Sequence, residues 1–416
     1  MAITMGDLRL MKAHEEATKE AMKDLEHFAQ TRVRKDGQNA LRKTNNFLTA
    51  SVTHSTSRAN DPQLHTHNLI FNVTWDENEK KFKALEAYEI YNNVEYFTEQ
   101  YRNILAHKVM ALGYQIERAK YGWELKGVSK EVCDLFSKRS AAIKEAEQSL
   151  EAARGRPITN RERAILTEQT RKKKSKNLTL EMAVEHQKSE LTKEQLMALE
   201  NTLNFAKIRI KDKEQVLGQF KKIFGDQEAK ERQPNLAEKE AVAFAIAHIF
   251  ERQSVVKKNE IVALALKTNY GKLESKYVQK ALENTPGLIF DNERETIGTV
   301  DGLAKEFFVC GFVNEQKNKV QGFGELSESR LEGLREDQKK AFIEIYQSKD
   351  KIMLLEGGAG SGKSHLLKAI TEAIKEKNMI VTATAPTSGA TQNLTKDIGV
   401  KAETIQKILH KLSSLT

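Results

Sequence analysis

Apolar positions recur at helical spacing through much of this 416-residue chain. The first such stretch covers residues 5–33, where apolar side chains return every three or four positions between lysines and glutamates. We therefore expect one amphipathic helix there, ended by a turn at Asp36-Gly37. A second helical pattern runs from Tyr88 to Gly113, and Gly113 is predicted to be its C-terminal cap.

Between and after these helices the pattern alternates with a period of two, which is typical of strands. Residues 1–127 are therefore predicted to form an α+β domain with an antiparallel sheet. The expected strands cover residues 49–53, 64–73, 82–85, 114–117 and 123–125.

The remaining chain divides by composition. Residues 128–230 are almost wholly charged and helical, with basic runs such as Arg171–Lys176, and a solvated helical connector is favoured there over a dedicated DNA-binding arm. Residues 236–290 carry three apolar helices and a strand, an order that resembles a small winged-helix-like module, and His248 is predicted to pack in its core. The expected segments are 1–140, 141–233, 234–325 and 326–416.

Charge and cysteine usage narrow the class of protein. The 67 Lys and Arg exceed the 58 Asp and Glu by nine, a mild basic excess that favours a polyanion such as DNA as partner. The two cysteines, Cys133 and Cys310, lie far apart without metal-site spacing, which predicts a reducing cytoplasm. No apolar run reaches the roughly 18 residues of a membrane span, so no membrane insertion is expected.

Three imidazoles gather within fourteen residues, at His54, His65 and His67. Because alternate residues of a strand project from one face, His65 and His67 point together. Asn60-Asp61-Pro62 predicts a turn that returns His54 to this pair. A lone His-x-His pair is a weak motif, but a third histidine behind a turn predicts an open, catalytic type of metal site suited to Zn²⁺, Mn²⁺, Ni²⁺ or a similar divalent ion.

A glycine-rich loop between an expected strand, residues 351–355, and an expected helix, residues 365–376, matches the phosphate-binding pattern GxxxxGK[ST]. Backbone N–H groups and the helix N-terminus are expected to hold the phosphates of ATP, with Lys363 at the β and γ phosphates and Ser364 on Mg²⁺. The predicted loop residues are Gly357, Gly358, Ala359, Gly360, Ser361, Gly362, Lys363 and Ser364.

The string HSTSRANDPQLHTHNLIFN resembles the signature of conjugative relaxases of the TrwC/TraI type (MobF, HUH class), and similarity extends over residues 31–139. This resemblance implies that His54, His65 and His67 bind a divalent metal such as Mg²⁺, Mn²⁺ or Zn²⁺. It also implies metal-dependent nicking of single-stranded origin-of-transfer DNA by transesterification, together with other relaxosome proteins. Arg58, inside the signature, is the expected DNA contact.

The C-terminal stretch is similar to superfamily 1 helicases, which implies the start of a RecA-like P-loop α/β lobe and ATP-dependent DNA unwinding. Gln338 stands where these helicases read adenine, and Pro386 and Thr387 end a segment that resembles their motif Ia, which touches single-stranded DNA. No later strand ends in the expected Asp-Glu pair of a Walker B motif, and no arginine finger or second RecA-like lobe follows.

Relaxases of this type attack DNA with a tyrosine close to the N-terminus, whereas Tyr88 is the first tyrosine here. The resemblance therefore implies a chain truncated at both ends, without roughly the first hundred residues of a relaxase and with impaired turnover, because a nucleophile must lie within reach of the metal. Two alternatives stay open. One is a non-catalytic DNA-binding or relaxosome module, or a decayed gene product, and the other is a RecD-like helicase fragment, which leaves the histidines unexplained.

Overall fold

The computed structural model describes residues 1–35, 37–170, 179–224, 232–358 and 360–413. The chain forms two compact units, Met1–Val300 and Asp301–Thr416. The basic run at residues 171–176 and Ala359 lie outside the described residues. In the described part of the chain, no helix combines the length and apolarity needed to cross a membrane.

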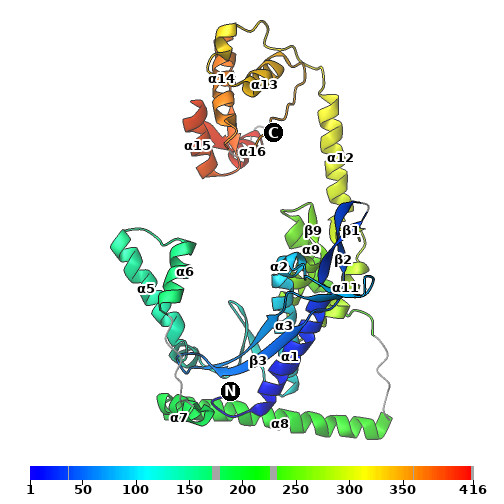
Figure 1. Ribbon diagram of the computed structural model, residues 1–416, viewed down its shortest axis with the longest axis vertical. Coiled ribbons are helices and arrows are strands. Elements are labelled where there is room, and N and C mark those ends of the chain that lie inside the picture. Colours follow the sequence, from blue (N-terminus) through cyan, green and yellow to red (C-terminus); the bar gives the residue numbers. More distant parts are fainter. Residues whose placement is uncertain (36, 171–178, 225–231, 359, 414–416) are drawn as a thin grey trace. The chain divides into compact units, whose positions relative to one another are not determined.

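The first unit begins with two long helices and a series of hairpins. Helices α1 and α3 lie side by side (Figure 1), and each sheet of residues 1–125 is a two-stranded antiparallel hairpin. The predicted α+β class is thus found as small antiparallel sheets and helices. The elements are α1 Leu8–Glu26, β1 Gln30–Lys35, β2 Gln38–Lys43, β3 Thr49–Thr56, β4 Pro62–Ile70, β5 Thr74–Asp76, β6 Lys81–Lys83, α2 Tyr88–Asn92, α3 Val94–Ala111, β7 Ile116–Ala119 and β8 Gly122–Leu125.

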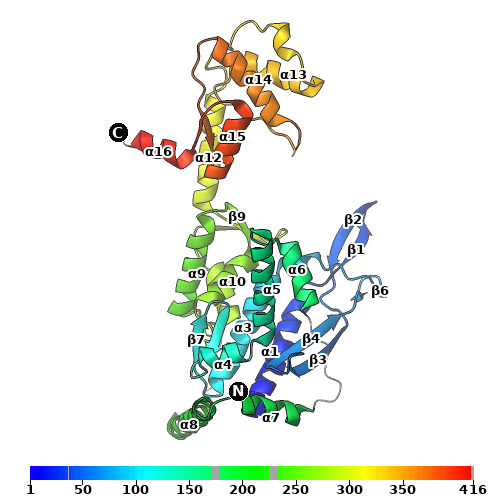
Figure 2. The ribbon, with the colours of Figure 1, turned by 90° about the vertical axis from the view of Figure 1, so that its left-hand side faces the viewer.

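The expected single helix over residues 5–33 is wrong at its C-terminal end. Helix α1 ends at Glu26, and residues 30–35 form β1, which pairs with β2 in the narrow hairpin visible in Figure 2. Lys35 pairs with Gln38, and of the expected turn at Asp36-Gly37 between them, Asp36 lies outside the described residues. This dipeptide favours a hairpin turn where strands flank it, and β-branched Thr31 and Val33 pack well on a sheet.

The predicted connector is more than a solvated linker. Ala206 of α8 is buried against Val109 and Tyr114, and Gln187 of α7 is fully buried, so these helices complete the core of the first unit. Charged residues dominate the composition of these helices, so composition alone did not predict their buried apolar positions. The connector helices are α4 Lys130–Leu135, α5 Lys138–Arg154, α6 Asn160–Gln169, α7 Leu180–Glu190 and α8 Lys193–Phe224.

Residues 236–299 form three helices and a three-stranded antiparallel sheet in the order β10-β11-β9. This module shares one hydrophobic core with Tyr96 and Phe97 of α3, so it belongs to the first unit. The expected buried position of His248 is wrong, because its ring is exposed on α9 and stacks against Phe244. The elements are α9 Leu236–Phe250, β9 Val255–Lys257, α10 Lys258–Thr268, α11 Ser275–Glu283, β10 Leu288–Asp291 and β11 Thr296–Thr299.

The second unit has its core between α13 and α14, where Phe342 is fully buried. Strands β12 and β13 pair in parallel on either side of α15 in the sequence, as expected of a βαβ arrangement. From residue 300 onward the elements are α12 Val300–Glu315, a 3-10 helix Glu328–Leu331, α13 Glu336–Gln347, α14 Lys363–Glu376, β12 Ala383–Ala385, α15 Ser388–Ile398, β13 Ala402–Thr404 and α16 Ile405–Ser413.

Gly113 follows α3 with a φ of +81°, and a Cβ added there would lie 2.1 Å from the carbonyl oxygen of Ala206 in α8. We expect Gly113→Ala to lower the free energy of unfolding by about 1–3 kcal/mol more than Gly287→Ala, because the new methyl group overpacks this contact. Gly287 is a matched control, since its φ is +79° and its Cβ would meet nothing within 4 Å. Denaturant unfolding measures both, and equal losses would contradict the close packing of α8 on Gly113.

Candidate metal centre and nucleotide-binding loop

The β3–β4 hairpin brings the three predicted imidazoles together on one face. His54 pairs directly with His65, and Val52 pairs with His67, so all three histidines project to the same side. The ring centroids of His54 lie 5.4 Å from those of both His65 and His67, and the latter two are 5.1 Å apart. The predicted convergence of the three histidines on one face of the hairpin is therefore confirmed.

The donor type and the ring spacing are those expected around a divalent ion, although the rings as placed do not form a complete site. Three imidazoles that each place a nitrogen about 2.0–2.1 Å from one tetrahedral ion have centroids about 5 Å apart. Nδ1 of His65 donates to the carbonyl oxygen of Gln63 at 2.9 Å, so in the neutral ring Nε2 carries the free lone pair. Within the described ranges, no group of three or more His, Cys, Asp or Glu is already arranged to hold an ion, so metal binding itself stays a prediction.

The opposite face of the hairpin rests on α1 and α3 through a chain of hydrogen bonds. Thr66, between the two histidines of β4, places its hydroxyl 2.8 Å from Nε2 of His14 and 2.9 Å from the hydroxyl of Thr53. Nδ1 of His14 lies 2.7 Å from the Tyr101 hydroxyl. Burial lowers the pKa of His14 and raises the pKa of Tyr101 to about 12, so the ring is neutral and the phenol protonated near pH 7.

The turn of the hairpin is held by the connector helices. Nε2 of Gln187 donates to the carbonyl oxygen of Asn60 at 2.9 Å, and Asn60 itself has a φ of +64°. Asp61 is buried with its Oδ1 3.5 Å from the Lys138 amine, and burial raises the pKa of this carboxyl. Arg58 is exposed on the same turn, so its guanidinium is accessible to a phosphate.

The glycine-rich loop leads into α14, which begins at Lys363 after Gly362 with a φ of +79°. The Lys363 amine donates to the carbonyl oxygens of Gly357 and Gly358, so it lies inside the loop, and Ser364 is exposed on the first turn. The expected strand at residues 351–355 is not formed, and Leu354 is 91% exposed. A strand is defined by hydrogen bonds to a neighbour, and no described strand pairs with this segment.

Gln338 contacts the end of this loop. Its side chain is buried, Nε2 donates to the carbonyl oxygen of Gly362 at 3.1 Å, and Oε1 accepts from the backbone N–H of Arg335 at 3.1 Å. The Arg335 guanidinium also donates to the carbonyl oxygen of Ser361 at 2.7 Å. These contacts connect the start of α13 to the end of the loop, while contact of Gln338 with adenine stays a prediction.

Pro386 and Thr387 are exposed where β12 leads into α15. The Thr387 hydroxyl accepts from the backbone N–H of Ala390 at 3.2 Å and caps α15. Ligands of α/β sheets bind beyond the carboxyl ends of strands, so the position suits a DNA contact, which stays a prediction.

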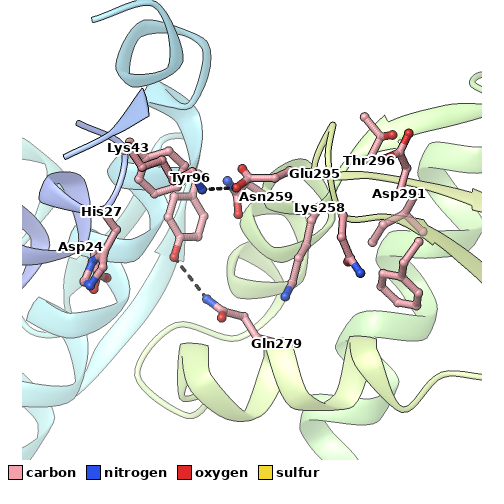
Figure 3. A pocket seen from close by; sticks show the side chains of 14 residues that line it. Asp24, His27, Lys43, Tyr96, Lys258, Asn259, Gln279, Asp291, Glu295 and Thr296 are labelled. Atoms are coloured by element: carbon pink, nitrogen blue, oxygen red, sulfur yellow. Dashed lines mark hydrogen bonds and ion pairs between the residues drawn. The ribbon is translucent and has the colours of Figure 1, made fainter. Parts of the chain in front are cut away.

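A further cavity of 490 Å³ lies between the first helices and the module of residues 236–299. Figure 3 shows two contacts that bridge it, from Lys43 to Glu295 and from Gln279 to the hydroxyl of Tyr96. Lys258, also in its lining, pairs with Glu283 at 2.6 Å. Since its lysines already have acidic partners, this cavity does not favour an anionic ligand.

Sequence reasoning missed His14, Tyr101 and Thr66 as members of the site. The one available signal was a histidine on the apolar stripe of α1, next to Ala13 and Ala17, because a buried imidazole needs hydrogen-bond partners. Those partners lie 52 and 87 positions away in the chain, so no local sequence pattern predicts them.

The sequence model of the TrwC relaxase family matches residues 1–194, and that of an AAA domain matches residues 333–416. A curated relative, the multifunctional conjugation protein TraI of Escherichia coli (strain K12), is 40% identical over 155 residues, which make up 35% of this chain and 9% of TraI. A second TraI sequence from Escherichia coli matches to the same extent. The chain thus spans less than a tenth of the length of these relatives.

Solved structures with similarity include the conjugative relaxase TrwC in complex with OriT DNA. Its metal-free form is 30% identical, with a TM-score of 0.42 and coverage of 45% of this chain and 66% of that chain. Its metal-bound form is also 30% identical with a TM-score of 0.42, and coverage is 49% of this chain and 68% of that chain.

Proposed function

Since the chain belongs to the TrwC/TraI family of conjugative relaxases through residues 1–194, we propose that its first unit acts on single-stranded DNA at an origin of transfer. The observation that carries this proposal is the cluster of His54, His65 and His67 on one face of the β3–β4 hairpin. The proposed location is the cytoplasm, and relaxosome proteins are the proposed protein partners.

The three imidazoles are the proposed ligands of Mg²⁺, Mn²⁺ or Zn²⁺. Such an ion, when bound, supplies positive charge that polarises a phosphodiester oxygen. His65 is oriented by its bond to the carbonyl oxygen of Gln63, and Arg58 presents a cation for a neighbouring DNA phosphate. In this proposal the hairpin therefore positions one phosphate of the DNA strand.

For the second unit we propose ATP with Mg²⁺ as the ligand of residues 357–364 and ATP-dependent DNA unwinding as the activity that this ligand drives. The match to an AAA domain and the Lys363 amine inside the loop support ATP binding. Ser364 is the proposed Mg²⁺ ligand, Gln338 the proposed adenine contact, and Pro386 and Thr387 the proposed DNA contacts. Ala359 belongs to the same proposed loop.

A second candidate function is DNA binding without cleavage. Tyr101 favours this candidate because its hydroxyl contacts His14 on the hairpin face opposite the imidazoles. It is therefore not placed to attack a phosphate held on the imidazole face. Its raised pKa of about 12 also makes it a poor nucleophile at neutral pH. The decayed-gene alternative predicts the same absence of turnover.

Two assays on the full chain separate these candidates. We expect Mn²⁺-dependent binding to a single-stranded origin-of-transfer oligonucleotide, at least about tenfold tighter than to a scrambled oligonucleotide of equal length and salt. Supercoiled origin plasmid then tests cleavage, with covalent 5′ adducts detected after denaturation. An adduct would establish nicking and exclude the binding-only candidate, whereas equal affinity for both oligonucleotides would contradict the proposed origin recognition.

A further inference from the structure

His14 is a buried histidine that the proposed chemistry does not use. It lies on α1 with 6% of its surface exposed, and both of its ring nitrogens face hydroxyl groups of other elements. Nδ1 meets Tyr101 of α3, and Nε2 meets Thr66 of β4. A single side chain therefore connects two helices to the strand that carries two of the proposed metal ligands.

The two hydroxyl groups that contact His14 can satisfy both nitrogens of its ring. A neutral imidazole has one donor and one acceptor, and a hydroxyl can serve as either. Whichever tautomer His14 adopts, one hydroxyl donates to the ring and the other accepts from it. Thr66 continues the chain to Thr53 on β3 at 2.9 Å. The chain of hydrogen bonds thus spans α3, α1 and both strands of the hairpin, with both nitrogens satisfied.

The position of Thr66 links this series of hydrogen bonds to the direction of the neighbouring imidazoles. Thr66 stands between His65 and His67, and successive strand residues point to opposite faces. Fixing the Thr66 hydroxyl toward α1 therefore directs both neighbouring imidazoles away from it, onto the face that also carries His54. A shift of one residue in the strand would reverse every side chain, so a polar contact at this position also defines the register.

The hairpin needs such a support because it has few others. β3 and β4 pair only with each other among the described strands, and Val52 and Leu69 on the imidazole face are exposed. An isolated two-stranded hairpin is marginally stable in water. Gln187 and Lys138 hold only its turn, so the strands depend on contact with α1 and α3 on the face opposite the imidazoles.

We propose that His14 is a positioning residue for the metal site, which acts through Thr66 to hold His65 and His67 in one direction. This inference rests on the proposed metal-binding function of the hairpin. His14 touches no ligand directly, so its effect must appear as a change in the arrangement of the imidazoles.

The test compares His14→Phe, which keeps a ring of similar shape without nitrogens, with His14→Gln, whose amide retains a donor and an acceptor. His27→Phe is the matched control, since His27 caps the same helix and is exposed. Calorimetric titration of the full chain with Mn²⁺ or Zn²⁺ is expected to give a Kd about 10–100-fold weaker for His14→Phe, as for other residues that orient metal-bound histidines. His14→Gln is expected to recover part of this loss, and His27→Phe to leave the Kd unchanged.

A readout without metal separates this inference from the metal proposal. In the metal-free chain with ¹⁵N-labelled histidine, ring resonances of His65 and His67 are expected to shift in His14→Phe and to stay in place in His27→Phe. Unchanged resonances together with an unchanged Kd in a folded His14→Phe chain would overturn the positioning role. If the native chain binds no metal while these resonances still shift, the metal proposal fails and the orienting contact stands.

Thr66→Val provides the second variant if His14→Phe does not fold. Valine keeps the branched shape of threonine, but it removes the hydroxyl that contacts both His14 and Thr53. We expect the same shift of the histidine resonances and a similar loss of metal affinity. Native resonances and native affinity in this variant would equally overturn the inference.

Discussion

Replacing His65 with alanine is expected to weaken the binding of Mn²⁺ or Zn²⁺ by more than about 100-fold, because it removes one of three proposed ligands rather than a group behind them. The ring centroid of His65 lies 5.4 Å from that of His54 and 5.1 Å from that of His67, so this ring is close to both other proposed ligands. Isothermal titration calorimetry on the full chain measures the effect, and circular dichroism checks that the variant is folded.

His248→Ala is the control for this experiment. His248 is exposed on α9 and stacks on Phe244 of the same helix, outside the hairpin. Its replacement should leave the titration as it is in the native chain. A folded His65→Ala variant that binds the ion as tightly as the native chain would remove the basis for a metal centre on the β3–β4 hairpin.

Lys363→Ala is expected to lose about 1.5–3 kcal/mol of ATP-binding free energy, which corresponds to roughly a 10- to 150-fold higher Kd, because a charged donor to the phosphates is removed. In the structure this amine already donates to the carbonyl oxygens of Gly357 and Gly358, so it lies where the loop closes. Fluorescence anisotropy with a labelled ATP analogue and Mg²⁺ measures the change.

Lys368→Ala is the matched control, since Lys368 is exposed on the same helix beyond the loop. It removes an equal charge and should leave the Kd within about twofold, as expected of an exposed charge distant from the ligand. Equal losses in both variants would mean that the helix attracts ATP by its general charge and that Lys363 has no specific role.

Local patterns were enough for the parts of the site that depend on period and short motifs. The alternation of a strand places His65 and His67 on one face, and the pairing of β3 with β4 returns His54 to them. The turn expected at Asn60-Asp61-Pro62 lies slightly earlier, at residues 57–60, and Pro62 already begins β4. The loop at residues 357–364 was recognisable because positive φ and close backbone approach require glycine there, as Gly360 and Gly362 illustrate.

Local patterns failed where another part of the chain decides the outcome. Residues 30–35 pair as a strand because β2 lies opposite, although helical spacing of apolar residues continues into them. Residues 351–355 have the composition of a buried strand but no described partner, so they stay unpaired and Leu354 is exposed. A strand, unlike a helix, cannot satisfy its hydrogen bonds within its own segment.

Residues close together in the chain were enough to predict the shared face of the three imidazoles, the glycine-rich loop at residues 357–364 and the similarity to conjugative relaxases. The contacts that support them come from distant parts of the chain: Gln187 donates to the carbonyl oxygen of Asn60, Gln338 donates to that of Gly362, and His14 lies between Tyr101 and Thr66. Each of these is a buried polar group, and such a group takes whichever partner the packing of distant elements brings within about 3 Å.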